Sequence, residues 1–189
     1  RGGVGSGGAH TAEATTYVRV EGQNDPPTVQ IEGYERAYKG DGKFDFLSAP
    51  SLDGPEDAPL PIHGLRIDDV DGDAPGALIG ARITVEHGTL TLDDTGGLEW
   101  LAGSGAGAGV GQRTVEFRGR PDAVNDALVN LLYTPDADWF GVDELRVAGT
   151  DYRRSRDLSG ELSAQLTDVA SVPIRIASVN DAPVWTAPA

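Results

Sequence analysis

The sequence predicts an all-β sandwich with one short helix, and three features of the residue pattern support this fold class. Short runs in which apolar and polar residues alternate recur along the chain, as expected of strands that bury one face. Gly, Pro and Asp, which end strands and form turns, separate these runs. A single stretch has its apolar residues at helical spacing. Many short strands with little helix are typical of two packed sheets.

Seven strands are predicted in chain order. They cover residues 27–33, 60–67, 81–86, 89–92, 113–118, 143–148 and 169–176. The helical stretch covers residues 122–132, where Val124, Leu128 and Leu131 share one face and Asp122 is placed to cap the N-terminus. We therefore expect a short helix that crosses the sandwich.

Two segments between the strands are predicted to be irregular. Residues 103–111 (GSGAGAGVG) have low complexity, so we expect a loop there. Residues 34–54 carry aromatic and apolar side chains between polar ones. For this segment we expect an ordered insertion that packs on the sandwich.

The composition excludes several classes of function. Asp and Glu total 30 against 15 Lys and Arg, a net charge of −15, which disfavours nucleic acid and anionic membranes as partners. The absence of Cys excludes disulfides, thiolate metal sites and Cys nucleophiles, and no apolar run approaches the length of about 18 residues that spans a bilayer. The absence of Met leads us to expect a piece of a longer protein. Much of the acid is gathered in Gly- and Pro-rich loops, a pattern that favours cation binding.

A strand and the turn after it occur twice. Residues 11–29 align without a gap with residues 167–185, at an offset of 156 residues (167 minus 11). Asn24-Asp25 aligns with Asn180-Asp181, and in both copies the motif reads Asn-Asp-x-Pro. Proline keeps the chain extended and prevents the strand from continuing as a paired ladder. The repeat predicts a tandem array with a unit of about 156 residues.

The repeat also sets the expected boundaries. Residues 1–24 would be the last strand and loop of a preceding repeat, residues 25–181 one complete repeat that includes the insertion at 34–54, and residues 182–189 the start of the next. Residues 11–23 would then either lack order or pair with a neighbouring molecule.

Four stretches of the chain together resemble a known family. They are EDAPLPIHGLRIDDVDGD from residue 56, VEHGTLTL from residue 85, RPDAVNDALVNLLYTPDADWFGVDELRV from residue 120 and VNDAPV from residue 179. In combination they resemble the cadherin-like tandem repeats of very large surface proteins, such as bacterial adhesins, and the related proteoglycan-type repeats. The resemblance implies an extracellular cadherin-like, immunoglobulin-like Greek-key sandwich, arranged in series at the cell surface with Ca²⁺ at the joints.

The resemblance also implies where calcium binds. At the N-terminal end of the repeat, linker residues would meet an Asp-x-Asp motif and a late Asp; the implied ligands are Asn24, Asp25, Asp69, Asp71 and Asp151. At the opposite end, the opening acidic pair would face the second linker; the implied ligands are Glu56, Asn180 and Asp181, with Asp136 or Asp138 nearby.

The chemistry of these residue types favours calcium independently of the resemblance. Ca²⁺ takes about 6–8 oxygen ligands and tolerates loose geometry, so carboxylates from two adjoining repeats could share one ion. Without the ion, these carboxylates would repel one another. The alternative is that Asp in such loops only forms turns, which Asp and Asn favour.

We therefore expect a structural repeat without catalytic residues, which acts as a rigid spacer in adhesion or in a surface appendage. Its partners would be the adjacent repeats of the same chain and, beyond them, other surface proteins or glycans. An alternative is a carbohydrate- or protein-binding module that uses residues 34–54 and the tryptophans Trp100, Trp139 and Trp185. Such a module could be accessory to a polysaccharide-active enzyme, and the sequence leaves these alternatives open.

Overall fold

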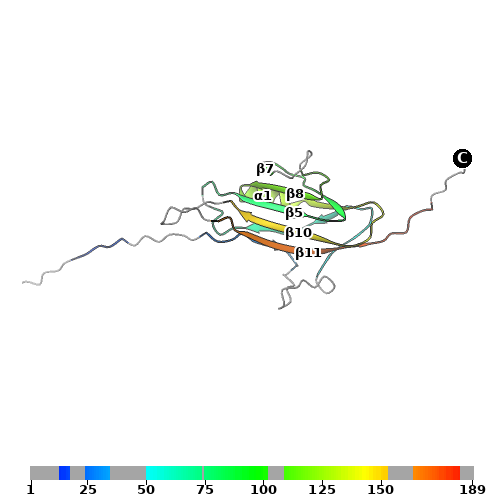
Figure 1. Ribbon diagram of the computed structural model, residues 1–189, viewed down its shortest axis with the longest axis horizontal. Helices are drawn as coiled ribbons and strands as arrows, with labels where there is room; N and C mark the ends of the chain where they lie inside the picture. The colour runs from blue at the N-terminus through cyan, green and yellow to red at the C-terminus, as the bar shows by residue number, and fades with distance from the viewer. Residues whose placement is uncertain are drawn as a thin grey trace, which may run out of the picture.

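The computed structural model of the chain describes residues 13–17, 24–34, 50–73, 75–101, 109–152 and 164–183. Within these ranges lie eleven strands and one helix (Figure 1). In chain order they are β1 (Thr28–Ile31), β2 (Leu52–Pro55), β3 (Leu60–Ile62), β4 (Leu65–Asp68), β5 (Ile79–Thr84), β6 (Gly88–Thr91), β7 (Leu98–Trp100), β8 (Thr114–Gly119), α1 (Pro121–Val129), β9 (Leu131–Pro135), β10 (Gly141–Asp151) and β11 (Thr167–Ala177).

The strands form one large sheet and two small ones. The large sheet has the order β2-β11-β10-β5-β8-β7, and its neighbours are antiparallel except for β2 and β11, which run parallel. The small sheets are β3-β9-β6 and β1-β4, both antiparallel. The predicted all-β architecture with a single helix is therefore confirmed for the described residues.

One hydrophobic core joins the three sheets. Along β5, β8 and β10 every second side chain is buried, for example Ile83, Phe117 and Leu145. These side chains belong to the same cluster as Ile67 of β4 and Tyr133 of β9, so the small sheets cover the inner face of the large one. Each sheet buries one face, which explains the alternating pattern of the sequence.

The predicted strand at residues 60–67 is wrong as a single element. It forms two strands, β3 and β4, which belong to different sheets. The chain turns at Gly64, whose φ of +72° suits a residue without Cβ. A Cβ at Gly64 would also lie 2.5 Å from the Cβ of Glu32, so this turn has room for glycine only.

The helix is shorter than predicted and begins differently. α1 ends at Val129, and Leu131, expected on the helix, is the first residue of β9. Asp122 is not the N-cap, because Arg120 occupies that position without a side-chain cap and Pro121 opens the helix. Asp122 lies in the first turn, where its charge suits the helix dipole. Val124 and Leu128 face the core as predicted.

Three strands, β2, β7 and β9, were not predicted, and β2 begins within the expected insertion at 34–54 and ends one residue beyond it. Of that insertion, residues 35–49 lie outside the described residues, and Tyr34 at its start packs against the core. Most of the expected loop at 103–111 also lies outside them. Residues 13–17 are exposed and have no regular structure.

The residues before β1 and those after β11 lie at opposite ends of the long axis of the sandwich (Figure 1). The core residues run from Val29 to Ile176, so they all fall within the predicted repeat at 25–181. In the described part of the chain, no helix has the length and apolar character needed to cross a membrane.

The packing around Gly88 makes a test of this core. A Cβ at Gly88 would lie 2.5 Å from the Tyr133 ring and 2.6 Å from the carbonyl oxygen of Thr134. We expect Gly88→Ala to lower the free energy of unfolding by about 1–3 kcal/mol, because the backbone cannot yield without moving a buried ring. Urea unfolding measures this change.

Gly96→Ala is the matched control. Its Cβ would meet only the end of the Asp94 side chain, at 3.1 Å, and the residue is exposed. The substitution should change stability by less than about 0.5 kcal/mol. Equal effects of the two substitutions would contradict the packing described for Gly88.

Candidate metal centres

One candidate centre lies where β10 ends and β1 begins. Asp151, the last residue of β10, is 1% exposed, and its carboxylate accepts a hydrogen bond from the side-chain amide of Asn24. The backbone N–H of Asp25 donates to the Asp71 carboxylate at 3.3 Å. The structure therefore brings the first linker to both the Asp-x-Asp motif and the late Asp, the residues that the resemblance implied.

The Asp-x-Asp motif forms a tight turn. The Asp69 carboxylate accepts the N–H of Asp71 at 2.8 Å, and the Asp69 carbonyl accepts the N–H of Gly72 at 3.0 Å. A Cβ at Gly72 would lie 3.0 Å from that carbonyl oxygen and 3.2 Å from Pro121. Asp69 thus has the turn-forming role that the alternative interpretation assigned to it, and the turn packs on the start of α1.

Asn125 of α1 holds this turn in place, and sequence reasoning missed it. Its amide oxygen accepts the N–H of Ile67 at 2.9 Å, while its amide nitrogen donates to the carbonyls of Ile67 at 3.0 Å and Pro121 at 2.9 Å. The side chain therefore pairs with β4 as a neighbouring strand would. It ties the residues just before Asp69 to the helix. Asn is a poor helix former, and its presence on a helix was the one available signal.

The Asn24 side chain tests whether these residues fit a cation. Its amide oxygen is buried and has no hydrogen-bond partner among the described residues. A buried acceptor without a partner is unfavourable by about 1–3 kcal/mol. Its amide nitrogen donates to the Asp151 carboxylate, whose oxygens are acceptors as well. Hard divalent cations take amide and carboxylate oxygens as ligands, so the donor set fits an oxygen-ligated divalent ion.

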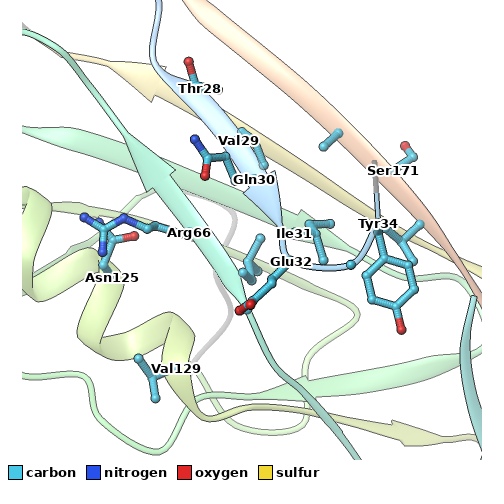
Figure 2. A pocket seen from close by; sticks show the side chains of 15 residues that line it. Thr28, Val29, Gln30, Ile31, Glu32, Tyr34, Arg66, Asn125, Val129 and Ser171 are labelled. Carbon is cyan, nitrogen blue, oxygen red and sulfur yellow. The ribbon is translucent and has the colours of Figure 1, made fainter. Parts of the chain in front are cut away.

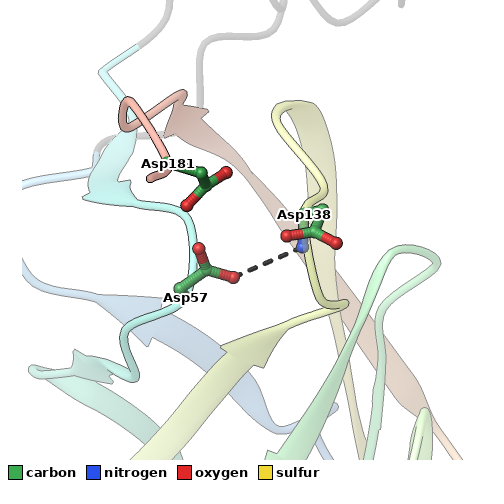
Figure 3. A group of neighbouring side chains, drawn as sticks. All are labelled: Asp57, Asp138 and Asp181. Carbon is green, nitrogen blue, oxygen red and sulfur yellow. Dashed lines mark hydrogen bonds between the residues drawn. The ribbon is translucent and has the colours of Figure 1, made fainter. Parts of the chain in front are cut away.

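A second candidate centre lies at the opposite end of the sandwich. Carboxylate oxygens of Asp57, Asp138 and Asp181 lie within 4.8 Å of one another, and all three residues are exposed (Figure 3). The N–H of Asp138 donates to the Asp57 carboxylate at 3.3 Å. At such separations each pair of charges repels by on the order of 1 kcal/mol even in water. This cluster could hold a metal ion.

The backbone of this cluster is strained. Asp57 has a φ of +62° and Asp138 a φ of +56°, and among the described residues these are the only non-glycine residues with positive φ. Left-handed backbone is unfavourable for residues with a Cβ, although Asp tolerates it better than most. Both strained residues point their carboxylates into the same cluster, and strain of this kind is concentrated at functional sites.

The remaining predicted residues of this end have other partners. Glu56 is buried, and its carboxylate accepts the N–H of Val179. It fastens the chain after β11 to β2 and so positions Asp181 without joining the cluster. Asp136 forms an ion pair with Arg113, with two nitrogen–oxygen distances of 2.9 and 3.1 Å.

Asn180 lies next to the cluster, but its side chain contacts the backbone of the following residue. Its amide nitrogen lies 3.4 Å from the carbonyl of Asp181, a weak contact within the linker. Asp57 was the member of the acidic pair that sequence reasoning did not assign as a ligand. Its position directly after Glu56 was visible, but which of the two carboxylates reaches the cluster depends on the left-handed turn at Asp57.

The buried carboxylate of Asp143 fixes the backbone near this end of the sandwich. Asp143 of β10 accepts backbone N–H groups from Glu86 at 3.0 Å, His87 at 2.9 Å and Glu144 at 2.7 Å. The Tyr133 hydroxyl lies 3.0 Å from both the Asp143 carboxylate and the carbonyl of His87. Asp143 therefore fixes the turn before β6 to β10.

The same turn fixes the connection that carries Asp138. The carbonyl of His87 accepts the N–H of Asp136 at 3.0 Å. The His87 ring stacks on Trp139, with ring centroids 4.5 Å apart and an interplanar angle of 11°. Since Asp138 lies between these two anchored residues, its unusual backbone conformation is held by contacts on both sides.

A groove with a volume of about 640 Å³ lies beside β1. It is lined by β1 and the residues that follow it up to Tyr34, by Arg66 of β4, by residues of α1 and by residues 170–172 of β11 (Figure 2). The groove mixes apolar and polar side chains. It is distinct from both carboxylate clusters.

Comparison of the chain with protein-family models, with curated proteins and with solved structures found no match.

Alkaline pH should destabilise the protein through Tyr133. Burial, the charge of Asp143 and the hydrogen bond to it, and the charge of Asp136 raise the Tyr133 pKa well above its ordinary value of about 10, against a smaller lowering by Arg113. A raised pKa means that the folded state binds the proton more tightly. This contribution to stability is therefore fully present below about pH 10 and is lost as pH rises further.

Unfolding in urea between pH 8 and 11 measures the loss. Tyr133→Phe should flatten the decline, although burial also raises the pKa values of Tyr34 and Tyr152, so part of it will remain. Tyr17→Phe, at a residue that is 94% exposed, is the control and should leave the profile unchanged. An equal decline in wild type and Tyr133→Phe would contradict the role of Tyr133.

Proposed function

We propose that this chain is a calcium-stabilised structural repeat of a large extracellular surface protein, which acts as a rigid spacer in adhesion or in a surface appendage. The observation that carries the proposal is the position of the two Asn-Asp-x-Pro linkers. One contributes Asn24 and Asp25 to the acidic centre at one end of the sandwich, and the other contributes Asp181 to the centre at the opposite end. The cadherin-like Greek-key topology and the tandem arrangement are part of the proposal.

The two centres would be two halves of one kind of joint. Asn180-Asp181 aligns with Asn24-Asp25, so it would meet the next repeat as Asn24 and Asp25 meet Asp151 and Asp71 here. A complete joint would then combine Asp57, Asp138 and the linker of one repeat with the Asp-x-Asp turn and the late Asp of the next.

Calcium at such a joint would supply charge neutralisation. The carboxylates repel one another without the ion, which favours a bent or mobile linker. With the ion, the linker is held to the ends of both repeats. Part of the net charge of −15 is gathered where calcium would neutralise it.

Weak calcium binding at the second centre would suit an extracellular location. Asp57, Asp138 and Asp181 are all exposed, and one chain supplies few ligands there. Calcium modules of this open kind bind with dissociation constants of about 10⁻⁴–10⁻³ M, which extracellular calcium can saturate and cytosolic calcium cannot.

Calcium should raise the thermal unfolding midpoint of the full chain. At about 100 times the dissociation constant, a bound ion contributes about 2.7 kcal/mol. For a domain of this size each kcal/mol corresponds to roughly 2–4 °C. Asp71→Asn, in the first centre, should reduce the rise in the midpoint that calcium causes.

Asp57→Asn acts on the second centre. In chelator it should raise the midpoint slightly by removing one of three repelling charges, and in calcium it should reduce the rise that the ion causes.

Asp94→Asn is the matched control. Asp94 is exposed and accepts the N–H of Gly96 in a turn that Asn can also form, away from both centres. It should leave the calcium response unchanged. Identical midpoints of the unsubstituted chain in calcium and in chelator would overturn the calcium part of the proposal.

The groove beside β1 favours a second candidate, a carbohydrate- or protein-binding module. Its volume of about 640 Å³ lies in the range of small-molecule sites. Its lining includes the aromatic side chain of Tyr34 and the guanidinium of Arg66, which also pairs with Asp68. A glycan array tests this candidate. Binding that persists in chelator and falls at least about tenfold with Arg66→Ala, but not with Arg120→Ala, would support it. A blank array would remove the glycan form of this candidate.

A further inference from the structure

Large apolar side chains are exposed at both ends of the sandwich, next to the linkers. Phe140 is 62% exposed and Val179 is 49% exposed at the end that carries the Asp57, Asp138 and Asp181 cluster. Val70 is 86% exposed at the other end, between Asp69 and Asp71. Single exposed apolar residues are ordinary, but these lie at the two surfaces that a tandem arrangement would bring together.

The duplicated linker shows which side chains would face each other. Asp25 and Asp181 are equivalent residues of the two copies. Val70 is the neighbour of Asp71, and the Asp71 carboxylate accepts the N–H of Asp25 in the first linker. Val70 therefore belongs to the repeat that follows a linker and lies beside that linker. Val179 and Phe140 belong to the repeat that precedes a linker, and they lie beside the linker Asn180-Asp181.

The positions of those two residues follow from the contacts of the cluster. Val179 comes two residues before Asp181, and its N–H is held by the buried Glu56. Phe140 comes two residues after Asp138, whose carboxylate lies within 4.8 Å of that of Asp181. A linker that joins two repeats would bring the residues on its two sides to the same joint.

We infer that Phe140 and Val179 of one repeat pack against Val70 of the following repeat, so that each joint has an apolar contact beside its ions. The partner of this surface is the next copy of the same kind of repeat. The inference rests on the tandem arrangement of the proposed function, but the contact itself needs no calcium.

The small size of the contact decides how it acts. Three side chains bury far less than the roughly 1,200 Å² of a stable interface between separate proteins. Covalent linkage raises the effective concentration to the order of millimolar, and a weak contact then forms within the chain. Separate chains should therefore not associate through this surface, while joined repeats should.

A protein with two joined copies tests the contact, with Asp181 of the first copy followed directly by Pro26 of the second. Each repeat then retains all of its core residues, which lie between Val29 and Ile176. Phe140→Ser in the first copy faces the joint, whereas Phe140→Ser in the second copy faces solvent. The second placement is thus a control of identical composition.

The joint-facing substitution should lower the thermal unfolding midpoint by about 2–4 °C more than the solvent-facing one in calcium. In chelator the difference should persist but be smaller, because repulsion between the carboxylates opposes a closed joint. Val70→Thr should do the same when it is placed in the second copy, and Phe140→Leu in the first copy should restore most of the loss. The joint-facing pair of Phe140→Ser and Val70→Thr should lower the midpoint by less than the sum of the single effects.

Equal effects of the two placements would overturn the inference, even if calcium raises the midpoint. A difference between placements in a protein that does not respond to calcium would support the apolar contact and overturn the calcium proposal. A difference that vanishes in chelator would overturn the claim that the contact forms without the ion.

Discussion

The antiparallel pairing of β10 with β11 is the constraint on which the rest of the structure depends. Each strand has eleven residues, and their ladder runs from Gly141 opposite Ile176 to Thr150 opposite Thr167. At about 3.4 Å per residue the pair spans roughly 35 Å. Asp151 ends β10 at one end of the sandwich, while Asp138 and Asp181 flank the pair at the other. The two acidic centres therefore stand at a separation that one rigid pair of strands sets.

Aspartate has two different roles in this fold. Some carboxylates accept backbone N–H groups and fix the chain: Asp143 holds three of them, and Asp168 at the start of β11 accepts the N–H of Val29 at 2.9 Å. Others, such as Asp138 and Asp181, are exposed and face carboxylates of like charge. Both kinds lie at strand ends and in turns. Part of the acidic composition therefore stabilises the fold, and part of it forms the candidate centres.

Sequence reasoning predicted most strands because burial of one face imposes an alternating pattern. It read residues 60–67 as one strand, since periodicity does not show that a chain changes sheets at Gly64. It placed Leu131 on the helix because an apolar residue at this spacing fits both a helix and the strand that follows. Strand β2 carries Leu52, Gly54 and Pro55, too little alternation to mark a strand, and its parallel pairing with β11 is a long-range contact.

The candidate centres were predicted unevenly, for physical reasons. The linker repeat led to Asn24 and Asp25, and the resemblance to cadherin-like repeats implied that they meet Asp71 and Asp151. The other end was harder, because which member of an acidic pair reaches a cluster depends on one left-handed residue, and because Asp136 had an arginine partner distant in sequence. The role of Asn125 depends on tertiary contacts that no local pattern encodes.

The opposite placement of the two linkers determines how the sandwich would carry tension. Force applied along the chain would enter near β1 and leave through the residues after β11, along the direction of the longest strands. β11 is paired with β10 along its length and with β2 near its end. The hydrogen bonds of such ladders lie across the pulling direction. The load would therefore shear many bonds together, whereas a sheet pulled from one edge would open them one after another.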